Sequence, residues 1–323
     1  MPQAPAAAAE LGGERKIVAA AGVASFVEGR PAGLAPVTVA YERRGSGEPV
    51  VLLHGLGQER KAWDAVAPLL ATEHEVIAVD LPGFGQSPDL PPDVPHDLSS
   101  VVAELGAVFT ALGLERPHVV GHSLGGLIAL RLAQAELARS VTALAPAGFW
   151  NTTERQYAFA VLAAARQIAR LPEAVVLRLC ETTPGRAALT GTVYGCPALC
   201  PPEALVACLR AMRGAVGFKA TLRAGRAPGL FTGDIPDVPV TIAWGTVDHL
   251  LPGRQAARAN AMIPGARLVW LPDCGHVPMN DAPELVARII LQATSPTAPA
   301  AGGTVHVPKP PTALSEVDNA PPA

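Results

Sequence analysis

The stretch HVVGHSLGGLIALRLAQ, residues 118–134, decides the fold of this chain. Its first five residues are typical of a buried strand, and from Leu124 onwards apolar residues recur at helical spacing. Between the two, residues 121–125 match G-x-S-x-G, a pattern typical of a sharp strand-to-helix turn that holds the serine hydroxyl outward. Larger side chains in place of the two glycines would collide in so tight a turn. The sequence therefore predicts that Ser123 is strained, exposed and available as a nucleophile.

Strand and helix patterns alternate on both sides of this turn. Besides residues 118–122, apolar or alternating runs predict strands at 36–42, 48–54, 74–83, 140–146, 238–245 and 266–272. Helical periodicity predicts helices at 97–114, 124–137, 253–262 and 282–294. Strands that alternate with helices form a parallel sheet covered by helices on both faces, so the predicted fold class is α/β.

The alternation is interrupted once, between residues 147 and 234. The patterns there are mainly helical, which predicts a helical insertion in a single α/β core formed by residues 14–146 and 235–294. Residues 295–323 are rich in proline, alanine and glycine and show no period, and residues 1–13 are similar. Such a composition predicts disorder at both ends.

A serine hydroxyl is a weak nucleophile without a base and an acid that orients the base. His276 follows the last apolar strand, and the carboxyl ends of parallel strands are where such a sheet assembles its chemistry. Asp248 follows the preceding strand and is the candidate acid, whereas Asp80 is expected to brace its own glycine-rich turn. The chain order Ser123, Asp248, His276 is the one expected for a serine at such a turn.

Two backbone N–H groups are predicted to hold the negative charge that develops on a carbonyl oxygen. Leu124 opens the helix after the serine, so its N–H has no partner within the helix. Leu56, in the HGLG turn at residues 54–57, is expected to supply the second. Histidines and aromatic side chains near these turns and in the insertion are candidate substrate contacts, although packing or hydrogen bonding explains such residues as well. They are His54, His122, Phe149, Trp150, Tyr157 and His249.

These motifs together resemble the α/β-hydrolase fold superfamily in its serine-hydrolase branch, over about residues 36–294. The resemblance is carried by HGLG (54–57), DLPGFGQSP (80–88), GHSLGG (121–126), WGTVDHLLP (244–252) and CGHVPMNDAPELV (274–286). It implies a mostly parallel eight-stranded sheet, a mobile helical cap over residues 147–234 and a triad of Ser123, Asp248 and His276. It implies no cofactor and no metal. The haloalkane dehalogenase and epoxide hydrolase branches have a similar layout but use aspartate where this chain has serine.

The activity expected from this resemblance is hydrolysis of a carboxylic ester through an acyl-enzyme. The apolar insertion favours a small to medium, largely apolar substrate. The same triad also serves carbon–carbon bond hydrolases, thioesterases, lactonases, acyltransferases and perhydrolases, and likeness of fold does not choose among them. A catalytically silent ligand-binding protein of the same fold is the non-enzyme alternative.

Charge and composition narrow the partners and the compartment. A net charge of −3 gives no general electrostatic attraction to a phosphate backbone, so nucleic acid is not an expected partner. No secretory leader or bilayer-length apolar run is evident, and five cysteines, an odd number, fit a reducing compartment. We therefore expect a cytoplasmic protein with a small-molecule, ester-like substrate and no stable membrane anchoring. The sequence leaves a homodimer open.

Overall fold

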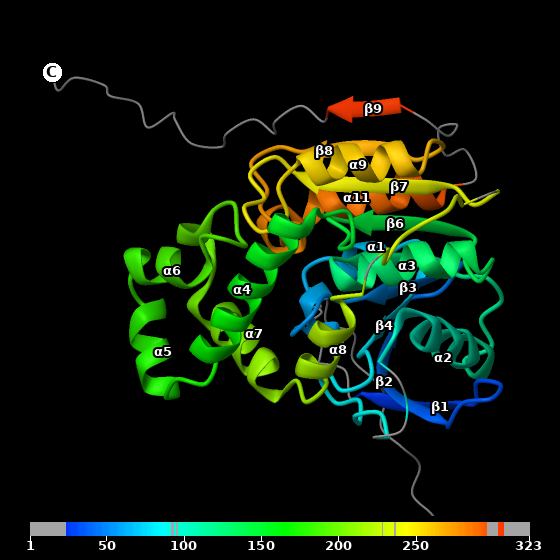
Figure 1. Ribbon diagram of the computed structural model, residues 1–323, viewed down its shortest axis with the longest axis horizontal. Coiled ribbons are helices and arrows are strands. Elements are labelled where there is room, and N and C mark those ends of the chain that lie inside the picture. Colours follow the sequence, from blue (N-terminus) through cyan, green and yellow to red (C-terminus); the bar gives the residue numbers. More distant parts are fainter. Residues whose placement is uncertain are drawn as a thin grey trace, which may run out of the picture.

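The computed structural model describes residues 24–295, apart from 92, 93, 95, 228 and 236, together with residues 303–306. The predicted disordered N-terminus and most of the predicted disordered tail lie outside this part of the chain. The described residues form one nine-stranded sheet with the order β1-β2-β4-β3-β5-β6-β7-β8-β9 (Figure 1). No described helix combines the length and the apolar character that crossing a membrane requires.

The predicted α/β fold with a mostly parallel sheet is confirmed. Strands β3 to β9 are mutually parallel, whereas β2 pairs antiparallel with both β1 and β4. The strands are β1 (Ser25–Gly29), β2 (Val37–Arg44), β3 (Pro49–Leu53), β4 (Glu75–Val79), β5 (His118–His122), β6 (Ser140–Leu144), β7 (Val240–Gly245), β8 (Arg267–Leu271) and β9 (Gly303–His306).

The expected number of eight strands is wrong, because β9 adds a ninth. It pairs parallel with β8, from Gly303 beside Arg267 to His306 beside Trp270, within the segment expected to be disordered. The edge of β8 would otherwise present unpaired backbone N–H and C=O groups, and Thr304 and Val305 favour strands. All four residues of β9 are exposed, so no buried face gives them a period that the sequence could show.

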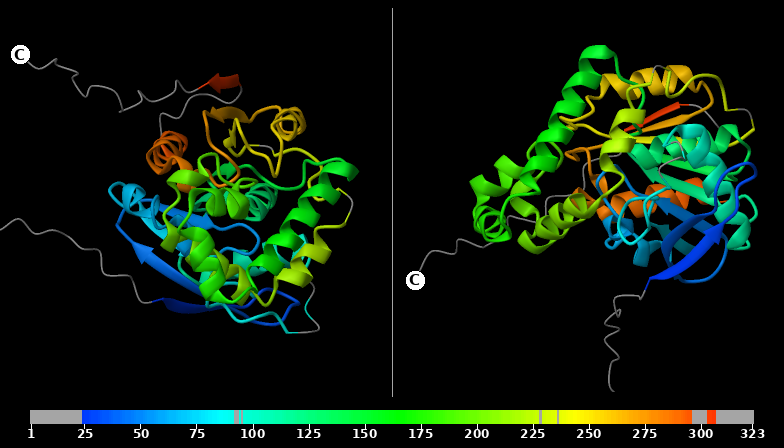
Figure 2. Two further views of the ribbon diagram at one scale, coloured as in Figure 1. Left: turned by 90° about the vertical axis from the view of Figure 1, so that its left-hand side faces the viewer. Right: turned by 60° about the horizontal axis from the view of Figure 1, so that its bottom comes forward.

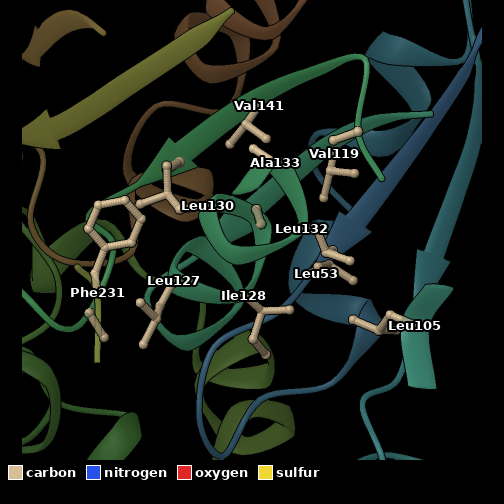
Figure 3. Close-up of a cluster of buried hydrophobic side chains, with 14 of the residues drawn as sticks. Leu53, Leu105, Val119, Leu127, Ile128, Leu130, Leu132, Ala133, Val141 and Phe231 are labelled. Atoms are coloured by element: carbon tan, nitrogen blue, oxygen red, sulfur yellow. The ribbon is translucent and has the colours of Figure 1, made fainter. Parts of the chain in front are cut away.

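Helices cover both faces of the sheet and create two hydrophobic cores. Side chains alternate across β3, so Val51 and Leu53 join the core under α2, α3 and α9, while Val50 and Leu52 join the core under α1 and α11. Figure 3 shows part of the first core, in which Leu105 of α2 and Ile128 of α3 lie near Leu53. The elements of the two layers are η1 (Arg60–Trp63), α1 (Ala67–Leu70), α2 (Leu98–Ala111), α3 (Leu124–Gln134), α9 (Arg254–Met262), α10 (Pro278–Asp281) and α11 (Pro283–Thr294).

Residues 147–234, here called the helical segment, connect β6 to β7 without a strand among its described residues. Figures 1 and 2 show the segment gathered at the end of the sheet to which the parallel strands point. That end is where β5, β7 and β8 deliver the predicted site residues. The segment consists of α4 (Thr152–Ile168), α5 (Glu173–Cys180), α6 (Thr183–Thr190), η2 (Pro197–Leu199), α7 (Pro202–Gly214) and α8 (Phe218–Ala224).

Candidate active site

Ser123 lies in the turn between β5 and α3, in a backbone conformation that side chains rarely adopt. Its φ is 53° and its ψ is −111°, a strained geometry that costs about 1–3 kcal/mol and persists only where the surroundings enforce it. A Cβ atom on Gly121 would lie 2.0 Å from the carbonyl oxygen of Gly125, and one on Gly125 would lie 2.3 Å from that of Leu53. The predicted steric need for both glycines is thereby confirmed.

Asp248 and His276, which are 28 residues apart in sequence, meet at the ends of β7 and β8. His276 Nδ1 lies 2.9 Å from Asp248 Oδ2, and both side chains are buried. Asp248 Oδ1 accepts hydrogen bonds from the backbone N–H groups of Leu250 (2.9 Å) and Leu251 (2.8 Å). A carboxylate only accepts, so Nδ1 of His276 is the donor in this bond, and in the neutral imidazole the lone pair lies on Nε2.

The loop that carries His276 is fixed from two sides. Asp281 Oδ2 accepts hydrogen bonds from the N–H groups of Gly275 (2.8 Å) and Gly195 (3.0 Å), so it ties the loop to the helical segment. On the other side, His122 Nε2 donates to the backbone oxygen of His276 (2.7 Å). Burial, with His276 as a second cause, lowers the pKa of His122 well below its ordinary value, which keeps this side chain neutral. His122 is therefore a positioning residue between Ser123 and His276.

The ring of His276 lies beside the turn that carries Ser123, here called the elbow, but does not form a hydrogen bond with the Ser123 side chain. The rings of His276 and His122 have centroids 4.8 Å apart, and His122 directly precedes Ser123 in the chain. In the described part of the chain, no hydrogen bond joins the Ser123 hydroxyl to His276 Nε2. The structure thus pairs the predicted acid and base and places them next to the turn of the predicted nucleophile.

Both residues that are predicted to supply oxyanion donors line the same cavity as Ser123. Leu56 belongs to the turn after β3, which is held by a hydrogen bond from Gly55 N–H to Gln58 Oε1 (2.8 Å). Leu124 is the first residue of α3. Leu56, Ser123 and Leu124 all line a mainly apolar cavity of about 270 Å³, here called the elbow cavity. The predicted nucleophile and both residues predicted to supply oxyanion donors therefore share one cavity.

The elbow cavity lies between the core and the helical segment. Leu127 and Ile128 of α3 line it from the core side, and Trp150, Phe159 and Leu222 line it from the helical segment. Such a largely apolar space suits a small or medium hydrophobic ligand. Within the described residues, no cluster of histidine, cysteine, aspartate and glutamate side chains is arranged to hold a metal ion.

A sequence model of the Alpha/beta hydrolase family matches residues 50–289, a span that runs from β3 into α11 and includes the elbow, Asp248 and His276. This chain belongs to the alpha/beta hydrolase family. The resemblance inferred from the motifs is thereby confirmed.

Individual relatives share the fold and differ in their activities. An uncharacterized protein of Mycobacterium tuberculosis is 29% identical over 275 residues, which are 81% of this chain and 79% of that protein. A pimeloyl-[acyl-carrier protein] methyl ester esterase of Aeromonas hydrophila is 42% identical over 97 residues, 30% of this chain and 36% of that enzyme. The solved structure of a meta-cleavage product hydrolase from Pseudomonas fluorescens has a TM-score of 0.65 at 22% identity, covering 82% of this chain and 96% of that chain. At that identity the structural likeness shows the fold alone.

Among the predicted substrate contacts, Trp150 lines the elbow cavity of this hydrolase-family fold and the others lie elsewhere. His54 is fully buried and bridges two turns: Nδ1 donates to the oxygen of Gly55 (2.8 Å), and Nε2 accepts from Leu81 N–H (3.0 Å). Phe149 packs in the core against Phe231, with ring centroids 5.3 Å apart.

The three remaining predicted substrate contacts do not line the elbow cavity either. His122 is the buried positioning residue described above, whereas Tyr157 and His249 are exposed. Asp80 braces its turn as expected, because its carboxylate accepts hydrogen bonds from Arg60 and from Gln86 N–H.

Sequence patterns did not single out Asp281 or Glu104. Asp281 follows His276 by five residues and bonds to nearby Gly275, but its bond to Gly195 joins groups 86 residues apart in sequence. Glu104 interrupts the apolar face of α2, where a polar residue is ordinarily assigned to the solvent side. It is instead buried in the wall of the elbow cavity. The sequence feature that could have revealed Glu104 is a charged residue at a position where the helical period predicts an apolar one.

Proposed function

We propose that this protein is a serine hydrolase that cleaves a carboxylic ester of a small to medium, largely apolar substrate through an acyl-enzyme. The observation that carries the proposal is the hydrogen bond from His276 Nδ1 to Asp248, next to an elbow that holds Ser123 in a strained conformation. The esterase from Aeromonas hydrophila, similar over part of this chain, adds support for an ester substrate.

The proposed reaction uses the free lone pair on His276 Nε2. As Ser123 Oγ attacks the ester carbonyl carbon, Nε2 takes the hydroxyl proton, and Asp248 stabilises the imidazolium that forms. The N–H groups of Leu56 and Leu124 hold the oxyanion, and each such donor lowers the free energy of the transition state by about 3 kcal/mol. His276 then protonates the departing alcohol, which leaves the acyl group on Ser123. Water, deprotonated by His276, releases the acid.

The missing contact between Ser123 and His276 is compatible with this mechanism. Hydrogen bonds between catalytic groups are often long in proteins without substrate and tighten when the substrate binds. The helical segment packs over the elbow cavity, so we propose that it acts as a cap whose closure over the ester brings these groups together.

A hydrolysis screen tests the proposed reaction. Short- and long-chain p-nitrophenyl esters, thioesters and lactones are offered to the wild-type protein and to Ser123→Ala. We expect the esters to be cleaved fastest and the variant to lose nearly all of the rate. Faster cleavage of thioesters or lactones would replace the ester assignment, and equal rates for the variant and the wild type would place the activity outside this site.

Labelling with a fluorophosphonate probe tests the non-enzyme alternative. A nucleophilic serine reacts covalently with such a probe, so we expect one label, on Ser123, in the folded wild-type protein. A folded protein that stays unlabelled would support a catalytically silent ligand-binding role.

A further inference from the structure

Gln58 lies between the two loops on which the proposed reaction depends. It closes the turn after β3, here called the oxyanion turn, because its N–H donates to Gly55 O (3.2 Å) and its Oε1 accepts from Gly55 N–H (2.8 Å). The same Oε1 atom lies 2.9 Å from His122 Nδ1. On its other side, His122 holds the main chain of His276 through Nε2 (2.7 Å). A continuous set of contacts therefore joins the oxyanion turn to the loop that carries the predicted base.

These contacts bring together distant parts of the chain at short range. Gln58 and His122 are 64 residues apart in sequence, and His122 and His276 are 154 residues apart. His122 is buried and Gln58 is half-buried. A Cβ atom on Gly55 would lie 2.9 Å from both Gln58 Oε1 and His122 Nδ1, closer than side chains approach one another in proteins. The oxyanion turn, Gln58 and His122 are therefore in direct contact.

The ring of His122 has fewer hydrogens than its neighbours can accept. Its two nitrogens face Gln58 Oε1 and the main-chain oxygen of His276, and a carbonyl oxygen only accepts. Burial holds the pKa of His122 well below its ordinary value, and a neutral imidazole carries a single N–H. When Nε2 donates to His276, Nδ1 therefore meets Gln58 with a lone pair.

Reversing the amide of Gln58 does not remove this shortage. With its nitrogen in place of Oε1, the amide would donate to His122 Nδ1, but the same NH₂ group would then face Gly55 N–H at 2.8 Å. Gly55 is buried, and a buried donor without an acceptor is costly. Gly55 therefore fixes the orientation of the amide, and one ring hydrogen serves two acceptor oxygens.

We propose that Gln58 is a positioning residue for the proposed reaction, and that it competes with the main chain of His276 for the single ring hydrogen of His122. A hydrogen on Nδ1 holds His122 to the oxyanion turn, and a hydrogen on Nε2 holds it to the His276 loop. The competition couples the position of the oxyanion donor to that of the base. The effect on rate rests on the proposed hydrolase function, whereas the shared hydrogen is a property of the folded protein.

Nitrogen-15 NMR of the His122 ring in Ser123→Ala protein tests the shared hydrogen without turnover. The His122 signals are assigned by their loss in His122→Phe. We expect the share of hydrogen on Nδ1 to increase from Gln58→Leu to the wild-type glutamine to Gln58→Glu, because leucine offers no acceptor and glutamate offers a charged one. Comparison of glutamate with glutamine suffices if the leucine variant does not fold. Identical ring signals for these residues at position 58 would overturn the proposal.

Hydrolysis of a p-nitrophenyl ester by proteins that retain Ser123 tests the positioning role. We expect Gln58→Leu to lower kcat by about 10²-fold with KM nearly unchanged, since a displaced oxyanion donor weakens an interaction made in the transition state. Gln58→Glu keeps an oxygen for Gly55 N–H and should lose less. The matched control Gln292→Leu, at an exposed glutamine of α11, should keep the wild-type rate. An unchanged kcat in Gln58→Leu, or equal losses in the two Gln58 variants when urea denaturation shows both folded, would contradict the role.

The two measurements together separate this inference from the proposed function. If the ring signals change in the expected order but the wild-type protein hydrolyses no ester, the shared hydrogen stands and the hydrolase assignment fails. If esters are hydrolysed and Gln58→Leu changes neither the ring signals nor kcat, the hydrolase assignment stands and the role of Gln58 fails.

Discussion

Ser123 depends on the two glycines that flank it, because the turn brings backbone atoms into contact with both of them. The Cβ of an alanine at position 125 would meet the carbonyl oxygen of Leu53, which belongs to the strand that leads into the Leu56 turn. The clash therefore involves the backbone and cannot be relieved by turning a side chain. The same substitution would displace both the serine and a proposed oxyanion donor.

We predict that Gly125→Ala lowers the free energy of unfolding by about 3 kcal/mol and removes labelling of Ser123 by a fluorophosphonate. Urea denaturation and mass spectrometry measure the two effects. Gly214→Ala is the matched control, since its Cβ would meet open space. A Gly125→Ala protein as stable and as reactive as the control would show that the elbow tolerates a side chain.

Glu104 makes stability depend on pH in the opposite direction to most carboxyl groups. Its pKa rises to about 7 on folding from an ordinary 4.5, so folding favours the protonated form. Its unfavourable contribution is absent below about pH 4.5, grows between pH 4.5 and about 7, and is fully present above that. At pH 8 the penalty amounts to about 3 kcal/mol, since one pKa unit corresponds to about 1.4 kcal/mol.

We predict that Glu104→Gln, which cannot ionise, gains about 3 kcal/mol of stability relative to the wild-type protein between pH 4 and pH 8. Urea denaturation of both proteins at the two pH values gives this difference directly. A difference that stays constant with pH would mean that Glu104 is not buried as the structure shows.

At the scale of elements, α4 is attached to the core through one carboxylate. Glu154 forms a capping box with Asn151 at the start of α4, and its side chain also pairs with Arg254 and Arg258 of α9. Burial opposes the charged form of Glu154, but Arg254, the N-cap backbone and Arg258 outweigh it and lower its pKa. This group therefore stabilises the fold at neutral pH, and its contribution is lost as the pH falls below 4.5.

We predict that Glu154→Gln lowers the free energy of unfolding by about 1–2 kcal/mol at pH 7, and that the loss shrinks at pH 3. Glu173→Gln is the control, because the pair of Glu173 with Arg210 is exposed to solvent and should contribute little to stability. Equal losses for the two variants in urea denaturation would refute a special anchoring role for Glu154.

The elements that the sequence predicted are those with a buried face. Strands β2 to β8 carry apolar runs because helices cover them, and the loops after β7 and β8 brought Asp248 and His276 together as expected for parallel strands. The edge strands β1 and β9 are largely exposed, so they lack such a pattern. Contacts such as those of Phe149 and Glu104 depend on how the helical segment and α2 pack, which periodicity alone does not specify.

At the scale of the molecule, a hydrophobic core packs on each face of the sheet, and the carboxyl edge of the sheet carries the candidate site. Helices α2 and α3, which pack on the first core, also line the elbow cavity, and Ser123 lies at the start of α3. A ligand in this cavity would therefore contact the α/β core as well as the helical segment.

The central claim is that Ser123 and His276 act as one unit, and a double-mutant cycle on ester hydrolysis tests it most directly. We predict that Ser123→Ala and His276→Ala each lower kcat/KM for a p-nitrophenyl ester by about 10⁴-fold or more, and that the double variant is no slower than either single variant. Losses that multiply in the double variant, or a Ser123→Ala protein with the wild-type rate, would contradict the account.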